Sequence, residues 1–205
     1  MFPKLPLILA STSPRRKELL KQVGLDFIVA PSEIEEKRAP GEAPADYALR
    51  LATDKALEVA GRHPSRLVLG ADTIVVLDQE VLGKPGDRWQ ARQMLCRLSG
   101  REHGVITAFA LVFQEGSLLV RRWVETRVRM KRLTDQEIEC YLNTGEPFDK
   151  AGGYAIQGKG VLLVESMEGC YTNVVGLPLP ALAEALKEFG ISVFSSKLEA
   201  QSRKL

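Results

Sequence analysis

The sequence predicts an α/β protein in which helices and strands pack around a shared core. The run Leu67–Leu77 is apolar and rich in β-branched residues, as in a strand that is buried on both faces. Segments with helical periodicity and clear caps alternate with short apolar segments along the chain. A length of 205 residues with 45% hydrophobic content is enough for a full core, as one domain or as two lobes that share a cleft.

The first third of the chain contains two short strands and two helices. Leu7–Ala10 is an apolar strand, and a helix follows it with Ser13 as N-cap, Pro14 in the first turn and Gly24 after its end. Residues 26–30 form the second predicted strand, and an acidic turn at 33–36 follows. Residues 45–60 have apolar positions at helical spacing and predict an amphipathic helix.

The middle of the chain predicts a sheet of long strands. After the strand 67–77, Asp78-Gln79-Glu80 reverses the chain, and Asp87 caps a helix that reaches Leu98. Residues 103–113 and 118–133 flank Glu115-Gly116 and predict a long antiparallel hairpin. Its second arm is basic on one side, which we interpret as a solvated sheet face and not as a nucleic-acid surface.

The last third predicts shorter elements. Thr134 and Glu137 form a capping box at the start of a helix that reaches Leu142. The loop 146–160 is rich in glycine and polar residues, residues 162–165 predict a strand, and 178–189 predict a helix. We expect residues 195–205 to form a frayed tail. The whole chain, residues 1–205, is predicted to form a single domain.

The composition excludes several classes of function. The net charge is +2, so the chain has no overall basic field for nucleic acid or a membrane, and a small anionic ligand is favoured. Three cysteines without a CxxC pair, and only two histidines, do not form a zinc pattern. The sequence shows no export signal and no membrane anchor, so we expect a cytoplasmic protein.

Three polar clusters predict the walls of one cleft for an anionic ligand. Ser11 to Arg16 surround a helix N-terminus, a favourable place for a phosphate, although the same residues also fit an ordinary capped helix. Lys84 follows the central strand after one short hairpin, and Asp149-Lys150 comes from the late loop. Lys55 lies at the apolar edge of its helix. Its side chain either has a structural role, which this position favours, or binds a phosphate in the cleft.

Asp72 is the most informative residue of the central strand. A carboxylate within an apolar strand is costly unless it is paired or binds a metal. Asp72 fits a turn between two short strands as well as it fits a catalytic role when the strand is considered alone. The neighbouring cationic clusters favour catalysis.

The late loop also contains a pattern close to a P-loop, at Gly153 to Gly160. It ends in Gly-Lys-Gly, whereas a P-loop requires Gly-Lys-Ser or Gly-Lys-Thr to supply a magnesium-binding hydroxyl. This difference speaks against a nucleotide kinase.

Taken together, six motifs resemble the Maf family of nucleoside triphosphate pyrophosphatases. The match runs in order from about Leu7 to Leu186 and is closest to the dTTP/UTP pyrophosphatase branch. The 7-methyl-GTP branch typically lacks the Pro-Arg-Arg and Tyr-x-Ile-Gln-Gly forms, and Ala155 is a mild departure because glycine is common there. The motifs are Leu9-Ala10-Ser11-Thr12-Ser13-Pro14-Arg15-Arg16, Gly70-Ala71-Asp72-Thr73, Gly83-Lys84-Pro85, Leu98-Ser99-Gly100, Asp149-Lys150-Ala151-Gly152 and Tyr154-Ala155-Ile156-Gln157-Gly158.

The resemblance implies a fold, a reaction and several residue roles. The fold is a mixed, strongly twisted α/β sheet with flanking helices and two lobes around a deep cleft, of the Maf/ITPase-like type, usually as a homodimer. The reaction is hydrolysis of a nucleoside triphosphate to the monophosphate and pyrophosphate with a divalent cation, Mg²⁺ or Mn²⁺. Asp72 takes the role of proton acceptor, and base preference is assigned to Arg15, Thr73 and Gln157.

These roles predict a complete site. Asp72 and Glu36 hold the metal, with Glu35 as the competing acidic partner. Ser11, Arg15, Lys55 and Lys84 bind the triphosphate, together with Asp149 and Lys150 of the late loop. We expect dTTP and UTP as the best substrates, CTP as a weaker one and purines far behind. A non-catalytic regulator of septation is the alternative from a different class.

Overall fold

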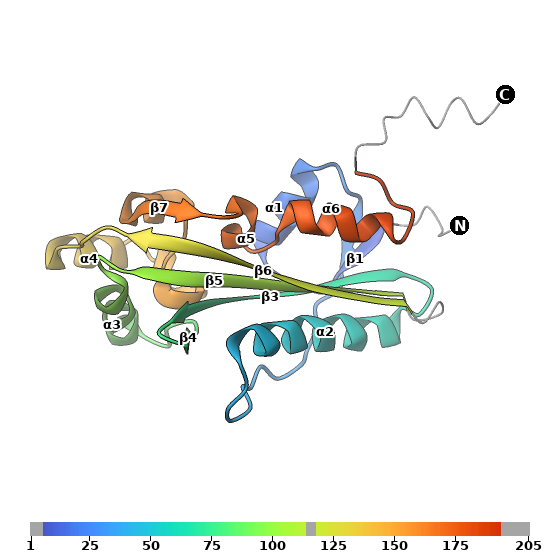
Figure 1. Ribbon diagram of the computed structural model, residues 1–205, viewed down its shortest axis with the longest axis horizontal. Coiled ribbons are helices and arrows are strands. Elements are labelled where there is room, and N and C mark those ends of the chain that lie inside the picture. Colours follow the sequence, from blue (N-terminus) through green and yellow to red (C-terminus); the bar gives the residue numbers. More distant parts are fainter. Residues whose placement is uncertain (1–5, 114–117, 194–205) are drawn as a thin grey trace.

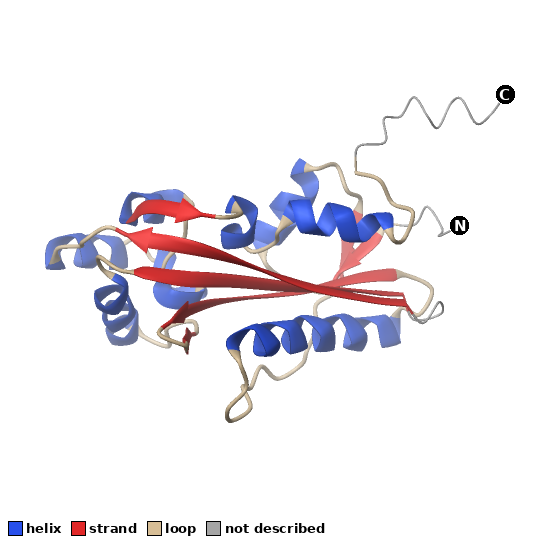
Figure 2. Cartoon of the chain, in the orientation of Figure 1, coloured by secondary structure: helices blue, strands red, loops and turns tan. Residues whose placement is uncertain are grey.

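A seven-stranded mixed sheet forms the centre of the protein (Figures 1 and 2). The structure is a computed structural model and describes residues 6–113 and 118–193. The sheet order is β2-β1-β3-β5-β6-β7, and β4 pairs separately with β3. The pairs β1/β2 and β1/β3 are parallel and the other pairs are antiparallel. The strands are β1 (Leu7–Leu9), β2 (Phe27–Val29), β3 (Leu67–Leu77), β4 (Glu80–Leu82), β5 (Glu102–Phe113), β6 (Leu118–Met130) and β7 (Val164–Glu168).

Helices cover both faces of this sheet (Figure 1). Helix α2 packs along one face, α1, α5 and α6 lie over the other, and α3 and α4 gather at one end. The helices are α1 (Pro14–Gln22), α2 (Pro44–Arg62), α3 (Arg88–Leu98), α4 (Asp135–Leu142), α5 (Tyr171–Val175) and α6 (Leu179–Lys187), with 3₁₀ segments at Glu146–Asp149, Ala151–Gly153 and Gly158–Leu163. The predicted α/β class and mixed sheet with flanking helices are confirmed.

Side-chain caps begin three of the helices at the predicted residues. The Ser13 hydroxyl accepts a hydrogen bond from the Arg16 N–H, and Asp87 accepts one from the Gln90 N–H at 2.7 Å. Thr134 forms the predicted capping box at the start of α4. These caps satisfy N–H groups that have no partner within a helix, which explains why the helix starts were predictable.

The core lies on both sides of the sheet. Phe109, Leu9 and Leu69 are buried against the side that α1 and α6 cover. On the other side, α2 comes so close to β3 that a Cβ atom on Gly70 would lie 2.2 Å from the Ala52 carbonyl oxygen and 2.7 Å from the Ala56 nitrogen. A glycine at position 70 is therefore what allows α2, and with it Lys55, to approach the centre of β3.

Strand β3 has one edge that is only partly paired. On this edge it pairs with β1 at Val68 and Leu69 and with β4 from Val75 to Leu77. Its other edge pairs with β5 throughout the segment 67–76. Residues 70–74 are therefore left between β1 and β4, and the cleft described below opens there.

In the last third, one predicted boundary was wrong and one helix was not predicted. The predicted strand 162–165 begins only at Val164, because residues 158–163 form a 3₁₀ segment and the pairing of β7 with β6 starts where Val164 lies opposite Met130. The five-residue helix α5 was not predicted. The predicted hairpin turn at Glu115-Gly116 and the predicted tail 195–205 lie outside the described residues. Among the described residues, no helix is long and apolar enough to cross a membrane.

Candidate active site

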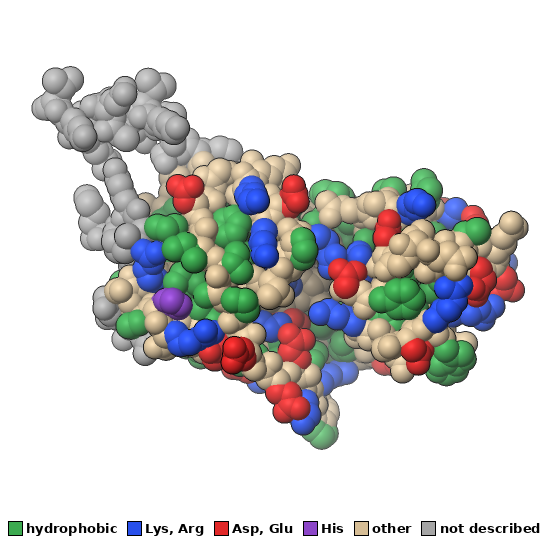
Figure 3. Space-filling view, turned by 180° about the vertical axis from the view of Figure 1, so that it is seen from behind, with side chains coloured by type: hydrophobic (Ala, Val, Ile, Leu, Met, Phe, Trp, Pro, Cys, Tyr) green, Lys and Arg blue, Asp and Glu red, His purple; other side chains and the backbone are tan. Residues whose placement is uncertain are grey.

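A cleft of about 570 Å³ opens at the unpaired segment of β3. Figure 3 shows it as a central hollow with basic and acidic side chains along its walls. Its walls come from the β1–α1 connection, the segment after β2, the β4 end and the late loop. All eight predicted substrate-binding residues and both predicted metal ligands line it, namely Ser11, Arg15, Glu36, Lys55, Asp72, Thr73, Lys84, Asp149, Lys150 and Gln157.

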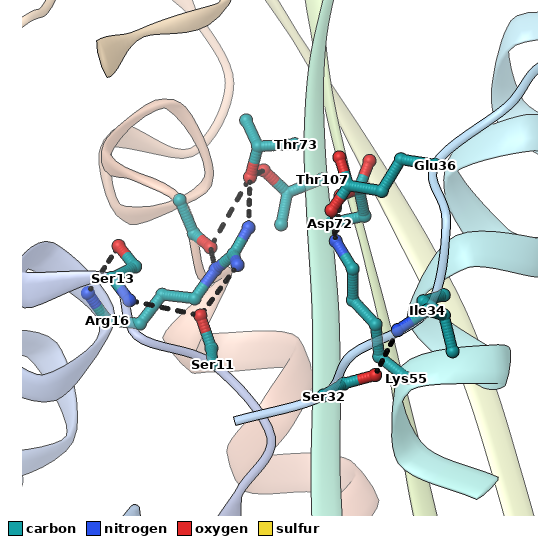
Figure 4. A network of polar contacts seen from close by, with 11 residues as sticks. Ser11, Ser13, Arg16, Ser32, Ile34, Glu36, Lys55, Asp72, Thr73 and Thr107 are labelled. Carbon is teal, nitrogen blue, oxygen red and sulfur yellow. Dashed lines mark hydrogen bonds and ion pairs between the residues drawn. The ribbon is translucent and has the colours of Figure 1, made fainter. Parts of the chain in front are cut away.

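Asp72 is paired inside this cleft with Lys55. The Lys55 Nζ lies 2.7 Å from Asp72 Oδ1 and 2.5 Å from Glu36 Oε1 (Figure 4). Asp72 and Lys55 are only 7% and 9% exposed, whereas the Glu36 side chain is half exposed. Lys55 thus does not extend along the surface toward solvent, as its sequence position had favoured, but joins two carboxylates from different segments.

The cleft changes the acidity of both carboxyl groups. Burial raises the pKa of Asp72 above its usual value, while the nearby Lys55 and Arg16 oppose this effect. Burial would also raise the pKa of Glu36, but the hydrogen bond and charge of Lys55, with Lys84 and Arg16, hold it below its usual value. Glu36 is therefore the stronger acid, and Asp72 is the better proton acceptor.

Arg16 organises the opposite wall. Its Nη1 donates to Ser11 Oγ at 3.1 Å, its Nη2 donates to Thr73 Oγ1 at 3.0 Å, and its Nε donates to the Gly176 carbonyl oxygen at 2.9 Å. The guanidinium therefore joins the start of α1, the centre of β3 and the end of α5 (Figure 4). The sequence placed Arg16 in the polar cluster Ser11 to Arg16 but predicted no individual role for it. Its spacing to Leu19 and Leu20 was the available signal, because all three lie on the buried face of α1.

An ion pair spans the cleft mouth between α1 and the late loop. Arg15 Nη1 lies 3.3 Å from Asp149 Oδ2, and Lys150 Nζ contacts the other oxygen of Asp149 at 2.5 Å. Lys150 Nζ also donates to the Glu146 carbonyl oxygen at 2.6 Å. Asp149 thus neutralises two cationic groups, and a ligand phosphate at this place would compete with it for both.

The remaining predicted residues complete the walls. Lys84 and Gln157 are exposed residues of the cleft lining, and Thr73 is half-buried beside Arg16. Glu35, the alternative to Glu36, is not among the lining residues and pairs with Lys37 at 2.6 Å. The geometry therefore favours Glu36 over Glu35 as the acidic partner of Asp72.

The two carboxylates fit a divalent cation. Both contact the same ammonium group, so they converge on one cationic position. Within residues 6–113 and 118–193 no group of three or more His, Cys, Asp or Glu side chains has metal-binding geometry. A site with two protein carboxylates is typical of Mg²⁺, which usually keeps several waters and binds substrate phosphates.

Known proteins resemble this chain along most of its length. Residues 6–189 match the family described as Maf-like protein. A protein of Symbiobacterium thermophilum named dTTP/UTP pyrophosphatase is 51% identical over 92% of this chain and 96% of its own length. Proteins of the same name from Geobacter sulfurreducens and Clostridioides difficile are 51% and 49% identical, over 90% and 92% of this chain and 96% and 97% of their own.

Among solved structures, a HAM1 protein from Coxiella burnetii is similar in part, with a TM-score of 0.44 and 17% identity over 63% of this chain and 74% of that protein. The Staphylococcus aureus Ham1 protein has a TM-score of 0.45 and 13% identity over 78% of this chain and 80% of its own. The family match covers nearly the whole chain, and the relatives align along almost their full length. The chain belongs to the Maf family.

Proposed function

We propose that this protein hydrolyses dTTP and UTP to the nucleoside monophosphate and pyrophosphate. The observation that carries the proposal is the buried Asp72 carboxylate at the open edge of β3, with cationic side chains on both sides of it. Its relatives at about 50% identity, which are named dTTP/UTP pyrophosphatases, support the same reaction.

Asp72 acts as the proton acceptor in this proposal. A water molecule attacks the α-phosphorus, the bond from that phosphorus to the bridging oxygen breaks, and pyrophosphate leaves with the bonding electron pair. The attacking water gives its proton to Asp72, whose pKa burial raises above that of a free carboxyl group. A general base with a raised pKa binds the proton more readily, so the environment of Asp72 supports this role.

The cationic residues bind the triphosphate and stabilise the leaving group. Arg15 and Lys84 line the cleft beside Ser11, and Lys150 approaches from the late loop. Charge-assisted hydrogen bonds to phosphate oxygens are strong, and they strengthen as negative charge develops on pyrophosphate. Lys55 would add a further positive charge near the phosphates from its position beside Asp72 and Glu36.

Asp72 and Glu36 would hold a divalent cation, Mg²⁺ or Mn²⁺. When bound, such an ion neutralises phosphate charge and lowers the pKa of a coordinated water. The convergence of both carboxylates on Lys55 Nζ supports this assignment.

Base selection is assigned to Gln157, Thr73 and Arg15, following the family resemblance. A side-chain amide such as that of Gln157 has both donors and an acceptor for the edge of a pyrimidine. Tyr154 and Ile156 also line the cleft, and we propose that they limit the room for a purine. We therefore propose the order dTTP and UTP first, CTP weaker, and ATP and GTP last.

We further propose a cytoplasmic homodimer without nucleic-acid or membrane partners. The exposed basic face of β6 supports the absence of a nucleic-acid site, because Arg127 and Arg129 lie 3.7 Å and 3.8 Å from the acidic groups of Glu168 and Glu102. Acidic neighbours reduce the attraction of such a face for phosphates.

The test is pyrophosphate release from a panel of triphosphates with Mg²⁺ or Mn²⁺. The proposal expects pyrophosphate and UMP or dTMP in equal amounts. A regulator that only binds nucleotides would release neither product, and a kinase would transfer the γ-phosphoryl group to an acceptor. A preference for GTP or 7-methyl-GTP would contradict the assignment to the dTTP/UTP branch.

A further inference from the structure

A chain of buried polar groups lies behind Thr73. Thr73 Oγ1 is 2.9 Å from Thr107 Oγ1, and Thr107 Oγ1 is 2.7 Å from the Asn173 carbonyl oxygen. The Asn173 side chain also accepts from the Thr107 N–H at 3.2 Å and donates to Thr126 Oγ1 at 3.0 Å. Thr107, Thr126 and Asn173 are fully buried, so no solvent competes for these hydrogen bonds.

The partners fix the direction of each hydrogen bond. The Asn173 carbonyl oxygen can only accept, so the single hydroxyl hydrogen of Thr107 points to Asn173. Thr107 must then accept in its contact with Thr73, so the Thr73 hydroxyl donates its hydrogen to Thr107. The alternative acceptor for Thr73, the Gly176 carbonyl oxygen, is 3.5 Å away and too distant to compete with a bond of 2.9 Å.

Thr73 is therefore an acceptor toward the cleft. Its hydrogen is used by Thr107, and one of its two lone pairs already receives the Arg16 Nη2 donor. Only one lone pair is left for a ligand. Ser11 is the reverse case, because its hydroxyl accepts from both Arg16 Nη1 and the Ser13 N–H, and its hydrogen is left to donate to a phosphate oxygen.

We propose that Thr107 is a positioning residue that makes Thr73 an acceptor for the N3–H group of uracil or thymine. This inference rests on the proposed function, since it requires a nucleotide base beside Thr73. Uracil and thymine carry one ring N–H that meets such an acceptor, whereas N3 of cytosine is itself an acceptor and is repelled. The flexible amide of Gln157 adapts to either base, so the fixed hydroxyl of Thr73 is the group that disfavours CTP.

Binding of uncleavable analogues tests this inference separately from turnover. The affinities of α,β-imido-UTP and α,β-imido-CTP, measured by calorimetry with Mg²⁺, give a selectivity ratio for each variant. Thr107→Val removes the acceptor for the Thr73 hydrogen, which is then free to donate to cytosine N3. We expect the preference for the UTP analogue to fall about tenfold, the scale of one buried hydrogen bond. Thr73→Val should lose a similar part of the preference, and adding Thr107→Val to it should change nothing more.

Thr126→Val is the matched control. It also removes a buried hydroxyl that contacts Asn173, but it leaves the pair of Thr73 and Thr107 in place. Its selectivity should stay within about twofold of the parent. If Thr107→Val weakens the binding of both analogues by the same factor, the role of Thr107 is merely structural and the inference is overturned. A parent protein that binds both analogues with equal affinity would also overturn it. If Thr107→Val does not fold, an unchanged ratio in Thr73→Val is equally decisive against it. Failure of the proposed function would be seen in a different measurement, because the parent protein would then release no pyrophosphate from UTP.

Discussion

Lys55 shows how a single side chain can hold two acidic groups ready for chemistry. Without it, Asp72 would be an unpaired carboxylate in a largely apolar strand, at a cost of several kcal/mol. With it, the Lys55 charge opposes the rise in pKa that burial causes for Asp72, and Glu36 is held at the same position. The same contacts therefore hold both carboxylates at the place where the proposed mechanism needs a cation and the attacking water.

Asp72→Asn should abolish turnover and preserve the fold. The amide has nearly the same shape, but it neither accepts a proton nor binds a cation as strongly, so we expect kcat to fall at least ~100-fold. Pyrophosphate release and thermal unfolding measured on the same preparation check this. Glu35→Gln also removes one carboxylate charge, but outside the cleft, and should keep a normal kcat. Near-normal activity of Asp72→Asn would show that Asp72 is not the general base.

Gln157→Glu should reduce the use of dTTP and UTP. A carboxylate cannot donate to a base carbonyl and repels it instead, a mismatch of about 1–3 kcal/mol when the bound base covers the contact. The measurement is kcat/KM for dTTP, UTP, CTP, ATP and GTP in parent and variant. Gln136→Glu makes the same chemical change on the exposed side of α4 and should leave all five values unchanged. An identical substrate order in Gln157→Glu would exclude Gln157 from the base site.

At the scale of elements, the contact between α2 and β3 determines whether Lys55 reaches Asp72. The sequence indicated both elements through their periodicity, and the caps Ser13, Asp87 and Thr134 indicated the helix starts. It did not show that Gly70 lies against the α2 backbone, because that contact depends on how the helix crosses the strand. Helix α5 could not be predicted either, since its five residues are too few to show a helical hydrophobic period. The Asn173 side chain attaches this helix to β5 by donating to the Val105 carbonyl oxygen.

Gly70→Ala should separate α2 from β3. The added methyl group would lie 2.2 Å from a backbone oxygen and 2.9 Å from Ala56 Cβ, so the helix must move. We expect the free energy of unfolding to fall by at least ~2 kcal/mol and kcat to fall as Lys55 shifts. Denaturant unfolding and pyrophosphate release measure both effects. Gly61→Ala, at the end of the same helix and with nothing within 4 Å of the new Cβ, should be neutral, and an equally stable Gly70→Ala protein would contradict the close packing.

At the scale of the whole molecule, the sheet is responsible for both the stability and the position of the site. The sequence predicted β3 and the cleft-forming clusters, because apolar runs and polar motifs are local signals. The open segment of β3 between β1 and β4 could not be predicted in this way, since strand order and register join residues far apart in the sequence. The role of Arg16 was hidden for the same reason, as its three partners belong to three elements.

The stability of the molecule should depend on pH through His103. This side chain is buried on β5 with its Nε2 2.6 Å from the Tyr154 hydroxyl, and Nδ1 has no hydrogen-bond partner among the described residues. Burial lowers the pKa of His103 from 6.5 to about 4. Between these pH values the unfolded chain binds a proton that the folded chain does not, so the free energy of unfolding should fall by up to about 3 kcal/mol as the pH decreases from 6.5 to 4.

Denaturant unfolding at several pH values checks this dependence. His103→Gln should show a smaller loss between pH 6.5 and pH 4 than the parent, because the group that gains the proton is gone. His63→Gln, which changes the other histidine of the chain, should keep the parent slope. Equal slopes in the parent and His103→Gln would show that other groups cause the acid sensitivity.

The open edge of β3 would also link the nucleotide supply to the lifetime of the protein. Neither the segment from β1 to α1 nor the one around α5 forms the cleft alone, so a bound nucleotide has to dissociate before either segment separates from β3. By mass action, a ligand at 100 times its Kd adds about 2.7 kcal/mol to the free energy of unfolding. A cell rich in pyrimidine triphosphates would thereby protect this chain from proteases, and a starved cell would clear it faster.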